Sequence, residues 1–584
     1  MAMTKPLSEQ VTYDGTTVKA ELDAINAKLA EWISVKDFGA VGDGVTDDTA
    51  AIQAALAARD HVLFPAGNYK ISSTLSLKSG NVLLGAGYSN TRIFRDTTVT
   101  PFDFFEGITV SGVKVSGIHF DNVAKLPVTV AGNRKCALRF WDNNTGNRSK
   151  DIVVEDCKFT YFTAAEFQPE GNRGVVALHL CDDAVVRGCW FEDNRSTCVF
   201  YGSTKNLRVL DNYCIGEQAP YDSNFQPTQG LGSFCSGGSE GCIIMGNRMR
   251  DTGYTSINCG GDGSVIANNV IINPSYSGIT INEGSSNPAR DLVITGNSIR
   301  DTYLSGISVF NADGFVIDGN SVVNTRGAGN GQIRLFPTSD GLAWPKNGTI
   351  SGNYLAASTA SNPGIRVNAG ENITVQGNVF FNNTIGIYVL TTDAAVPASL
   401  QVLGNLFKDN SSYAIETAST GVAAQVLDID GNTLISSDIA TKQSTGVVIN
   451  GAITTARFGR NTFSDNYNTN LIETSFANRA TKAVLALNSP TISRMKLLDA
   501  INYINTVTYD PASIASGSGI TTTMSVPGAA VGDLVDVSFS QPLQGLQLWG
   551  WVSGPDVVSV RFHNQTSAAV DLASGTLTVR VRKI

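Results

Sequence analysis

Residues 35–53 of the chain read VKDFGAVGDGVTDDTAAIQ, and this segment passes from a Gly-rich loop into a helix. Residues 47–49, Asp-Asp-Thr, stand directly before the spaced apolar residues Ile52 and Leu56. Acidic side chains at this position accept hydrogen bonds from free backbone N–H groups and interact favourably with the helix dipole. We therefore predict one helix over residues 47–58 and give its acidic residues a structural role.

A turn dipeptide that ends in Asn, most often Gly-Asn, repeats along the middle of the chain. It comes after a first predicted strand at residues 62–69, VLFPAGNY. Its Asn recurs at intervals of 22 to 35 residues. Such a period, with one turn and its strands in each copy, is typical of a solenoid. The repeated positions are Asn212, Asn247, Asn269, Asn297, Asn320, Asn353, Asn378, Asn405, Asn432 and Asn461.

Short β-branched segments follow these turns with the pattern Gly-Ile-x-Val or Gly-Ile-x-Ile. They lie at residues 278–281, 306–309, 364–367 and 386–389. Strict alternation of this kind predicts strands with one face buried inside the coil and the other face outside. The fold class indicated is therefore all-β, with parallel strands stacked along one axis.

Residues 35–53 and 62–69 together resemble the entry segment of the pectate-lyase superfamily of right-handed parallel β-helices. This superfamily includes polygalacturonases and the tailspikes of bacteriophages. The resemblance implies a right-handed parallel β-helix whose open end is covered by the helix at residues 47–58. A cap of this kind protects unpaired backbone at the end of the coil.

The N-terminal segment carries apolar residues at spacings of 4, 3, 4 and 3, which is typical of a coiled-coil seam. Either this helix associates with copies of itself as a short stalk, or it packs on its own domain. The residues of the seam are Val18, Leu22, Ile25, Leu29 and Trp32.

The last hundred residues hold short alternating strands between Gly and Pro turns, at 521–526, 534–539, 546–552, 557–562 and 577–581. This pattern predicts a small β-sandwich. It resembles the C-terminal modules that close tailspike and tail-fibre trimers. We expect three domains: a stalk for virion attachment at 1–33, the β-helix at 34–480, and a sandwich for trimerisation or glycan binding at 481–584.

The composition excludes several classes of function. Lys and Arg number 42 and Asp and Glu 51, so the net charge is 42 − 51 = −9. An acidic chain is not a general nucleic-acid binder, and no apolar run is long enough to insert in a membrane. The nine Cys form no CxxC pair. We expect buried thiols rather than a disulfide or zinc site, and no metal or other cofactor.

The outward positions of the repeated strands predict two rows of side chains along one face. The first row contains His179, Phe200, Asn258, Thr280, Ser308, Arg334, Arg366, Tyr388 and Glu416, and the second contains Asn282, Phe310, Phe336 and Asn368. Aromatic faces, guanidinium groups and amides suit a chain of sugars. We predict substrate binding by His179, Asn258, Phe310, Arg334, Phe336, Arg366 and Tyr388. The alternative is that a neighbouring subunit covers the aromatic residues.

Carboxylates follow these strands, and we predict catalytic roles for Glu283, Asp262 and Asp313. Stacked strands place Asp262 about 5 Å from Glu283 and about 10 Å from Asp313. The first spacing suits a retaining glycosidase and the second an inverting one, so the stereochemistry stays open. A lyase is the alternative, in which Arg334 and Arg366 would stabilise charge beside a uronic-acid carboxylate.

The resemblance to tailspikes implies a homotrimer that binds and cuts capsular polysaccharide, exopolysaccharide or O-antigen on the host surface. It also implies a place on the virion tail, with the N-terminus joined to the phage tail or to an adaptor protein. The missing Asn-Thr-Asp, Gly-His-Gly and Arg-Ile-Lys motifs argue against plant-type pectin cleavage. We expect an endo-acting glycoside hydrolase, with a polysaccharide lyase and a non-cleaving adhesin as alternatives.

Overall fold

A computed structural model describes most of the chain, and the ranges below give its extent. They are residues 12–13, 16–29, 31–124, 135–142, 147–162, 174–194, 196–216, 233–281, 287–327, 330–338, 341–357, 362–390, 398–418, 424–435, 445–450, 453–463, 472–474, 482–485 and 502–582.

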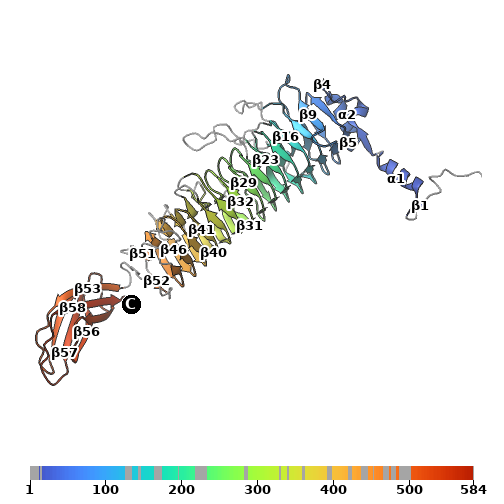
Figure 1. Ribbon diagram of the computed structural model, residues 1–584. Helices are drawn as coiled ribbons and strands as arrows, with labels where there is room; N and C mark the ends of the chain where they lie inside the picture. The colour runs from blue at the N-terminus through green and yellow to red at the C-terminus, as the bar shows by residue number, and fades with distance from the viewer. Residues whose placement is uncertain are drawn as a thin grey trace, which may run out of the picture.

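The chain winds into an elongated coil of parallel strands, which confirms the predicted right-handed parallel β-helix (Figure 1). Each turn contributes one strand to each of three sheets, which we call sheets I, II and III. In one turn, β28 (Val265–Ala267) lies in sheet II, β29 (Val270–Ile272) in sheet III and β30 (Ile279–Ile281) in sheet I. Every strand pairs in parallel with its equivalent in the next turn.

Sheet I contains the Gly-Ile strands. In stacking order it contains β7 (Leu75–Leu77), β10 (Phe105–Ile108), β13 (Leu138–Trp141), β17 (Val176–His179), β21 (Val199–Lys205), β24 (Cys235–Glu240), β27 (Ile257–Cys259), β30, β33 (Ile307–Val309), β36 (Ile333–Leu335), β39 (Pro363–Val367), β42 (Ile385–Val389), β45 (Tyr413–Ala418), β48 (Thr445–Asn450) and β51 (Ile472–Thr474). Two short strands, β14 (Ser149–Lys150) and β18 (Cys181–Asp182), extend its edge.

Sheet II follows sheet I along each turn. It contains β3 (Trp32–Ser34), β5 (His61–Phe64), β8 (Val82–Gly85), β11 (Lys114–Ser116), β15 (Val153–Glu155), β19 (Val185–Arg187), β22 (Arg208–Leu210), β25 (Ile243–Met245), β28, β31 (Ala289–Thr295), β34 (Ala312–Asp318), β37 (Lys346–Ser351), β40 (Gly370–Gln376), β43 (Ala398–Leu403), β46 (Ala424–Asp430), β49 (Ile453–Phe458) and β52 (Lys482–Leu485).

Sheet III completes the coil. It contains β4 (Asp43–Asp47), β6 (Gly67–Ile71), β9 (Thr91–Arg95), β12 (His119–Asp121), β16 (Lys158–Thr160), β20 (Trp190–Glu192), β23 (Tyr213–Ile215), β26 (Arg248–Arg250), β29, β32 (Ser298–Arg300), β35 (Ser321–Val323), β38 (Tyr354–Ala356), β41 (Val379–Phe381), β44 (Leu406–Lys408), β47 (Thr433–Ile435) and β50 (Thr462–Phe463).

A helix caps the N-terminal end of the coil, as the sequence predicts. It differs from the prediction in its first residue, which is Thr49 and not residue 47, and in the contacts of Asp48. The capping helix α2 spans Thr49–Ala58 and buries Ile52 and Leu56 against the core. The Asp48 carboxylate does not cap this helix but accepts hydrogen bonds from Val41 N at 2.6 Å and Gly42 N at 3.1 Å. It therefore holds the Gly-rich loop, which is a structural role but not the helix capping expected of it.

The predicted coiled-coil seam is wrong at its last position. Helix α1 spans Val18–Leu29, whereas Trp32 lies in β3 and pairs with His61 of β5. Pairing with the coil takes precedence here, because the Trp32 ring also packs at a tilt against the His61 ring, with the ring centroids 4.9 Å apart. Before α1, β1 (Thr12–Tyr13) and β2 (Thr16–Thr17) pair as a hairpin, and after β3 a 3-10 helix, η2, spans Val35–Phe38.

The strands of the coil pass both predicted boundaries of the 34–480 domain. Strand β3 begins at Trp32, and β52, which pairs with β49, ends at Leu485. Both belong to sheet II because they complete its hydrogen-bonded ladder. In the ranges described, no helix is long and apolar enough to cross a membrane.

The repeated Asn residues form a continuous amide ladder at the turn from sheet II to sheet III. The Oδ1 of each Asn accepts both the backbone N–H and the Nδ2–H of the preceding Asn, at 2.9–3.0 Å. Each side chain is almost completely buried. From Asn212 to Asn461 the ladder therefore satisfies the buried backbone of the turns.

The interior of the coil is filled by aliphatic residues and by stacked aromatic rings. Phe120, Phe159 and Phe191 stack in successive turns with ring centroids 5.3 and 4.9 Å apart, and Phe380 and Phe407 stack at 4.6 Å. All nine Cys are free and buried, as expected for small apolar side chains.

On the outer face of sheet III, His119 sits in a partly buried charged network. Burial lowers the pKa of His119 to about 4, with a further lowering by Lys158 and Arg92, against the opposing effect of Asp121 and Glu192. The imidazole is therefore neutral in the folded chain at pH values where an exposed His is partly charged.

We expect the melting temperature to fall as the pH drops from about 6.5 to about 4. In that window the unfolded chain binds a proton at His119 and the folded chain does not, so folding loses at most about 1.4 kcal/mol per pH unit. The variant His119→Gln removes this titration and is expected to give a flatter profile. Parallel melting profiles for the two proteins would exclude His119 as the source.

The C-terminal module consists of two three-stranded antiparallel sheets around their own core, which confirms the predicted sandwich strands. One sheet has the order β53 (Asn502–Tyr509), β58 (Gly575–Arg582), β55 (Leu534–Phe539). The other has the order β54 (Gly519–Ser525), β57 (Val557–Asn564), β56 (Leu546–Gly554). Strand β53 was not predicted. Its described side chains are mostly exposed, so its pattern lacks a buried face.

Candidate functional site

The connections on both sides of sheet I are the long ones, whereas those from sheet II to sheet III are short. Sheet III leads to sheet I through residues 122–137 and 216–234, and sheet I leads to sheet II through residues 336–345. The turn from β28 to β29 contains only residues 268–269. Because functional residues gather where long connections join a rigid scaffold, the outer face of sheet I is the candidate site.

The first outward row of sheet I is confirmed in register apart from one residue, although its members Thr280 and Ser308 are buried. Its aligned positions are Glu106, Arg139, Ala177, Phe200, Ser236, Asn258, Thr280, Ser308, Arg334, Arg366, Tyr388 and Glu416. The placement of His179 in this row is wrong. Ala177 pairs with Phe200, and His179 pairs with Gly202, one outward position further along the strand.

The second outward row stacks as predicted over three consecutive turns. Phe310 N donates to Ile281 O at 3.1 Å, Phe336 N donates to Val309 O at 3.0 Å, and Asn368 N donates to Leu335 O at 2.8 Å. Backbone bonds therefore fix these side chains one turn apart. Asn282 of this row lies outside the described residues.

Phe310, Arg334, Phe336 and Arg366 form one group, which we call the Arg–Phe cluster. The Arg334 guanidinium lies 3.7 Å from the Phe336 ring centroid and 5.9 Å from that of Phe310. The Arg366 guanidinium lies 5.4 Å from the Phe336 ring. All four side chains are partly exposed. They offer a ligand two aromatic rings and two cations within three turns of the coil.

Amides and burial hold the two guanidinium groups. Arg334 Nη1 donates to Asn330 Oδ1 at 3.1 Å, and Arg366 Nε donates to Asn368 Oδ1 at 2.9 Å. Burial lowers the pKa of Arg366, against an opposing effect of Tyr388. Since an Arg side chain keeps its charge in proteins, Arg366 is a cation that has already lost part of its hydration. Such a group binds an anion more strongly than an exposed Lys or Arg does.

Tyr388 and Glu416 continue the first row beyond the Arg–Phe cluster and lie directly opposite one another in register. Burial and the Glu416 carboxylate raise the pKa of the Tyr388 phenol, whereas Arg366 lowers it. The phenol therefore stays protonated at neutral pH and can donate a hydrogen bond.

The two predicted binding residues nearer the N-terminus lie apart from the Arg–Phe cluster. Asn258 is partly exposed, between Ser236 and Thr280 in register. His179 lies over Gly202, where a Cβ atom would meet the imidazole Nδ1 at 2.7 Å. Burial lowers the pKa of His179, helped by Arg148 and Arg139.

A charged group next to His179 was not predicted. Arg139 Nη1 lies 3.2 Å from Asp103 Oδ2 and 3.3 Å from Glu106 Oε1, and its guanidinium stacks over the Trp141 ring at 4.4 Å. Trp141 Nε1 donates to Glu106 Oε1 at 2.8 Å. The alternating run Leu-Arg-Phe-Trp at residues 138–141 was the available signal, because it places Arg139 and Trp141 on one face.

The structure places two of the three predicted catalytic carboxylates around Arg290. Asp262 Oδ1 accepts a hydrogen bond from Arg290 N at 2.8 Å, and Asp262 Oδ2 lies 3.4 Å from Arg290 Nη1. Asp313 pairs in register with Arg290 and with Lys346, which lie in the turns on either side of it. The two carboxylates thus lie in turns on opposite sides of Arg290. Glu283 lies outside the described residues.

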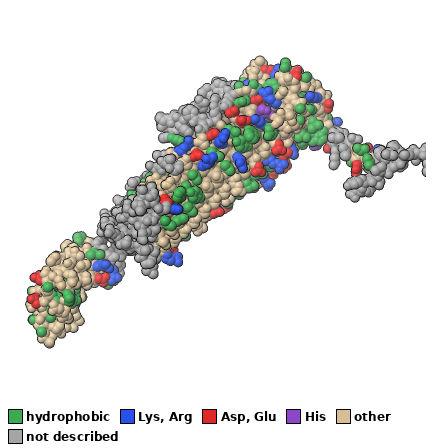
Figure 2. Space-filling model, in the orientation of Figure 1, with side chains coloured by type: hydrophobic (Ala, Val, Ile, Leu, Met, Phe, Trp, Pro, Cys, Tyr) green, Lys and Arg blue, Asp and Glu red, His purple; other side chains and the backbone are tan. Residues whose placement is uncertain are grey.

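These carboxylates belong to a column of alternating charge along the edge of sheet I and the start of sheet II. Its paired positions include Asp182 with Lys205, Lys205 with Glu240, Arg290 with Asp313, Asp313 with Lys346, and Lys346 with Glu371. The visible face of the coil likewise carries acidic, basic and hydrophobic side chains interspersed (Figure 2). Asp262 and Asp313 therefore help to join successive turns.

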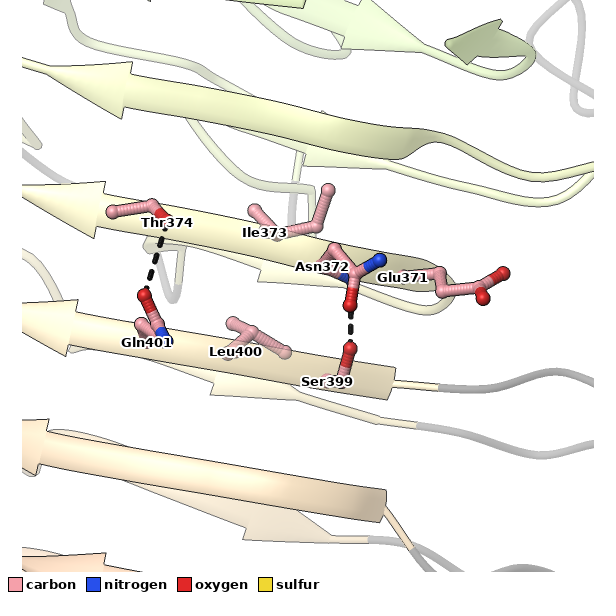
Figure 3. Close-up of a pocket in the computed structure, with 7 residues that line it drawn as sticks. All are labelled: Glu371, Asn372, Ile373, Thr374, Ser399, Leu400 and Gln401. Carbon is pink, nitrogen blue, oxygen red and sulfur yellow. Dashed lines mark hydrogen bonds between the residues drawn. The ribbon is translucent and has the colours of Figure 1, made fainter. Parts of the chain in front are cut away.

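A hollow of about 280 Å³ lies on sheet II, next to Glu371 of the charged column. Ile373 of β40 and Leu400 of β43 are among the residues that line it (Figure 3). Asn372 N donates to Ser399 Oγ at 2.7 Å across it. Among the described residues, no group of three or more His, Cys, Asp and Glu side chains is arranged to hold a metal ion.

Two segments of the chain match known families. Residues 32–123 match the family described as rhamnogalacturonase A/epimerase, pectate lyase-like, and residues 230–466 match the family described as right handed beta helix region. With the stacked sheets, these matches define the class of the protein: a right-handed parallel β-helix protein with a pectate-lyase-like N-terminal segment.

Individual relatives cover smaller parts. The chain is 28% identical over 293 residues to the mannuronan C5-epimerase AlgE2 of Azotobacter vinelandii. The matched region covers 47% of this chain and 25% of that protein. The chain is 30% identical over 137 residues to the preneck appendage protein of Bacillus phage PZA, which covers 23% of this chain and 15% of that protein. The chain thus spans a quarter or less of these relatives.

One solved structure is similar to the chain at low identity. It is the tailspike protein of E. coli bacteriophage HK620 in complex with pentasaccharide, at 12% identity and a TM-score of 0.41, with 98% of this chain and 97% of that chain covered.

Proposed function

We propose that the chain is a bacteriophage tailspike that binds and cleaves a bacterial surface polysaccharide on the outer face of sheet I. The observation that carries this proposal is the Arg–Phe cluster, whose rings and guanidinium groups repeat in register along the coil. Successive turns about 4.8 Å apart offer repeated contacts to a polymer. The phage relative named above supports a place on a virion.

The proposed reaction is endo-acting hydrolysis, with Glu283, Asp262 and Asp313 as the catalytic carboxylates. His179, Asn258, Tyr388 and the Arg–Phe cluster are the proposed substrate contacts. We also propose that the protein is a homotrimer joined to the phage tail or an adaptor through its N-terminus. Leu22 on α1 supports self-association, because 48% of this apolar side chain is exposed in the single chain.

A polysaccharide lyase is the second candidate, and a specific observation favours it. Arg334 and Arg366 are direct neighbours in register, so their guanidinium groups suit the carboxylate of a uronic acid. The similarity to enzymes named for mannuronan points to the same kind of substrate.

Incubation with a panel of capsular polysaccharides, exopolysaccharides and O-antigens tests the proposal. We expect a fall in viscosity for one of them, with oligosaccharides detected by mass spectrometry. Hydrolysis adds water to each product, whereas a lyase leaves an unsaturated uronide that absorbs in the ultraviolet. Binding without any fall in viscosity would support an adhesin and contradict the enzyme.

The double variant Arg334→Ala/Arg366→Ala is expected to weaken polysaccharide binding by about 30-fold or more. Arg side chains at the centre of a binding surface contribute about 2 kcal/mol or more, and 1.4 kcal/mol is a factor of ten. Titration calorimetry with the cleaved oligosaccharide measures the change. Arg300→Ala is the matched control, since Arg300 lies on sheet III in an exposed ion pair with Asp301. Equal affinities for both variants would contradict the assignment of the site.

A further inference from the structure

The C-terminal module exposes two tryptophans on the outward face of the sheet formed by β54, β57 and β56. Trp549 and Trp551 alternate along β56 with Leu548, Gly550 and Val552, which face the core of the module. Each indole is 41% exposed. At two positions apart on one strand they stand about 7 Å from each other on the same face. Two adjacent exposed indoles mark a binding surface.

Arg561 gives this surface a cationic side chain in a fixed position. It lies opposite Trp549 in register, and its Nη1 donates to Thr521 Oγ1 at 3.0 Å. A Cβ atom on Gly519 would come within 3.0 Å of Arg561 Nη2 and 3.1 Å of Nε. The absent side chain of Gly519 thus leaves room for the guanidinium to lie close to the sheet.

His563 borders the same surface. It pairs with Gly519 on one side and Gln547 on the other, and its ring meets the Trp549 ring edge-on at 6.2 Å. Its Nδ1 is buried and has no hydrogen-bond partner among the described residues. The face therefore combines two indoles with side chains that form hydrogen bonds.

We propose that this face, made of Trp549, Trp551, Arg561, His563 and Thr521, is a polysaccharide-binding platform separate from sheet I. The two indoles would stack on the apolar C–H faces of consecutive sugar rings, and the polar side chains would bond hydroxyl or carboxylate groups at their edge. Indole rings supply a large contact area at low entropic cost.

A second copy of the chain could also bind to the C-terminal module. The sheet formed by β53, β58 and β55 is better suited to such a contact than the tryptophan face is. Ile504 on β53 and Leu534 on β55 are 55% and 53% exposed, and they pair with the outward residues Arg580 and Arg582 of β58. This aliphatic group fits a contact between subunits, whereas the tryptophan face carries the hydrogen-bonding groups that a sugar requires.

Affinity electrophoresis of the full chain tests the platform. The gels contain hydroxyethyl cellulose, xylan, dextran, alginate, or one of the bacterial polysaccharides of the panel above. To separate the two sites, Trp549→Ala/Trp551→Ala is made in the wild type and in the Arg334→Ala/Arg366→Ala variant. We expect at least one polymer to retard the Arg334→Ala/Arg366→Ala variant. Adding Trp549→Ala/Trp551→Ala to this variant is expected to weaken its binding to that polymer at least about tenfold.

Val531→Ala is the matched control, because it removes a 73% exposed apolar side chain from the same module at a position outside both sheets, and Ile504→Ala tests the contact between subunits. Arg561→Gln is a second variant that leaves both indoles in place and is expected to weaken binding as well. The platform is overturned if no polymer retards the Arg334→Ala/Arg366→Ala variant, or if the tryptophan changes leave retardation unaltered. It is also overturned if those changes dissociate the oligomer in sedimentation while Ile504→Ala does not.

Discussion

Glu283→Gln is expected to lower the rate of polysaccharide cleavage by about 10²- to 10⁴-fold while the dissociation constant of the polysaccharide stays unchanged. This range is the usual contribution of a positioned general acid or base, and Gln keeps the shape of Glu without its proton chemistry. The strand before Glu283, β30, lies between β27, which precedes Asp262, and β33, which precedes Asp313. Quantifying reducing ends over time gives the rate.

Asp262→Asn and Asp313→Asn are the companion variants, and the structure makes them distinguishable. Both are expected to slow cleavage. Asp262 also accepts a hydrogen bond from Arg290, and Asp313 one from Asn347 Nδ2 at 2.7 Å, so a small fall in melting temperature should accompany each change. If an Asp variant lowers the melting temperature but not the rate, that carboxylate has only a structural role. Full activity of Glu283→Gln would remove Glu283 from the site.

Asn320→Ala is expected to destabilise the coil by roughly 3–5 kcal/mol. The change removes the acceptor of Asn297 N and Nδ2 and the donor to Ile294 O at 2.9 Å, and it leaves Asn353 Oδ1 without one of its two donors. Each buried polar group left without a partner costs about 1–3 kcal/mol. The melting temperature and the rate of unfolding in denaturant measure the loss.

Gln401→Ala is the matched control for the amide ladder. Gln401 is an exposed amide on sheet II of the same coil, with one hydrogen bond of 3.4 Å from Thr374. Its removal is expected to change stability by less than about 0.5 kcal/mol. An Asn320→Ala protein as stable as Gln401→Ala would contradict the role given to the ladder.

The regular part of the coil was predictable because an Asn recurs at the same turn of each repeat. Asn is needed wherever an amide must satisfy the turn above and the turn below, so its spacing marks each repeat, as at Asn320 and Asn353. The Gly-Ile strands then fix the outward row from Asn258 to Glu416.

Prediction failed where no such mark was present. The strand at residues 176–179, VALH, has no Gly-Ile pair to set its register, and His179 was therefore placed in the wrong row. Glu106 and Arg139 lie on strands that precede the first repeated turn, so their pairing was invisible in the sequence. Trp32 keeps the heptad spacing, but pairing with β5 outweighs it.

A crystal structure of the Glu283→Gln chain with a bound oligosaccharide is the most direct test of whether sheet I binds the polysaccharide. We expect sugar rings along the outer face of sheet I, in contact with Arg334, Phe336 and Arg366. If the β-helix bound sugar only on the outer faces of sheets II and III, the assignment of the site to sheet I would be contradicted.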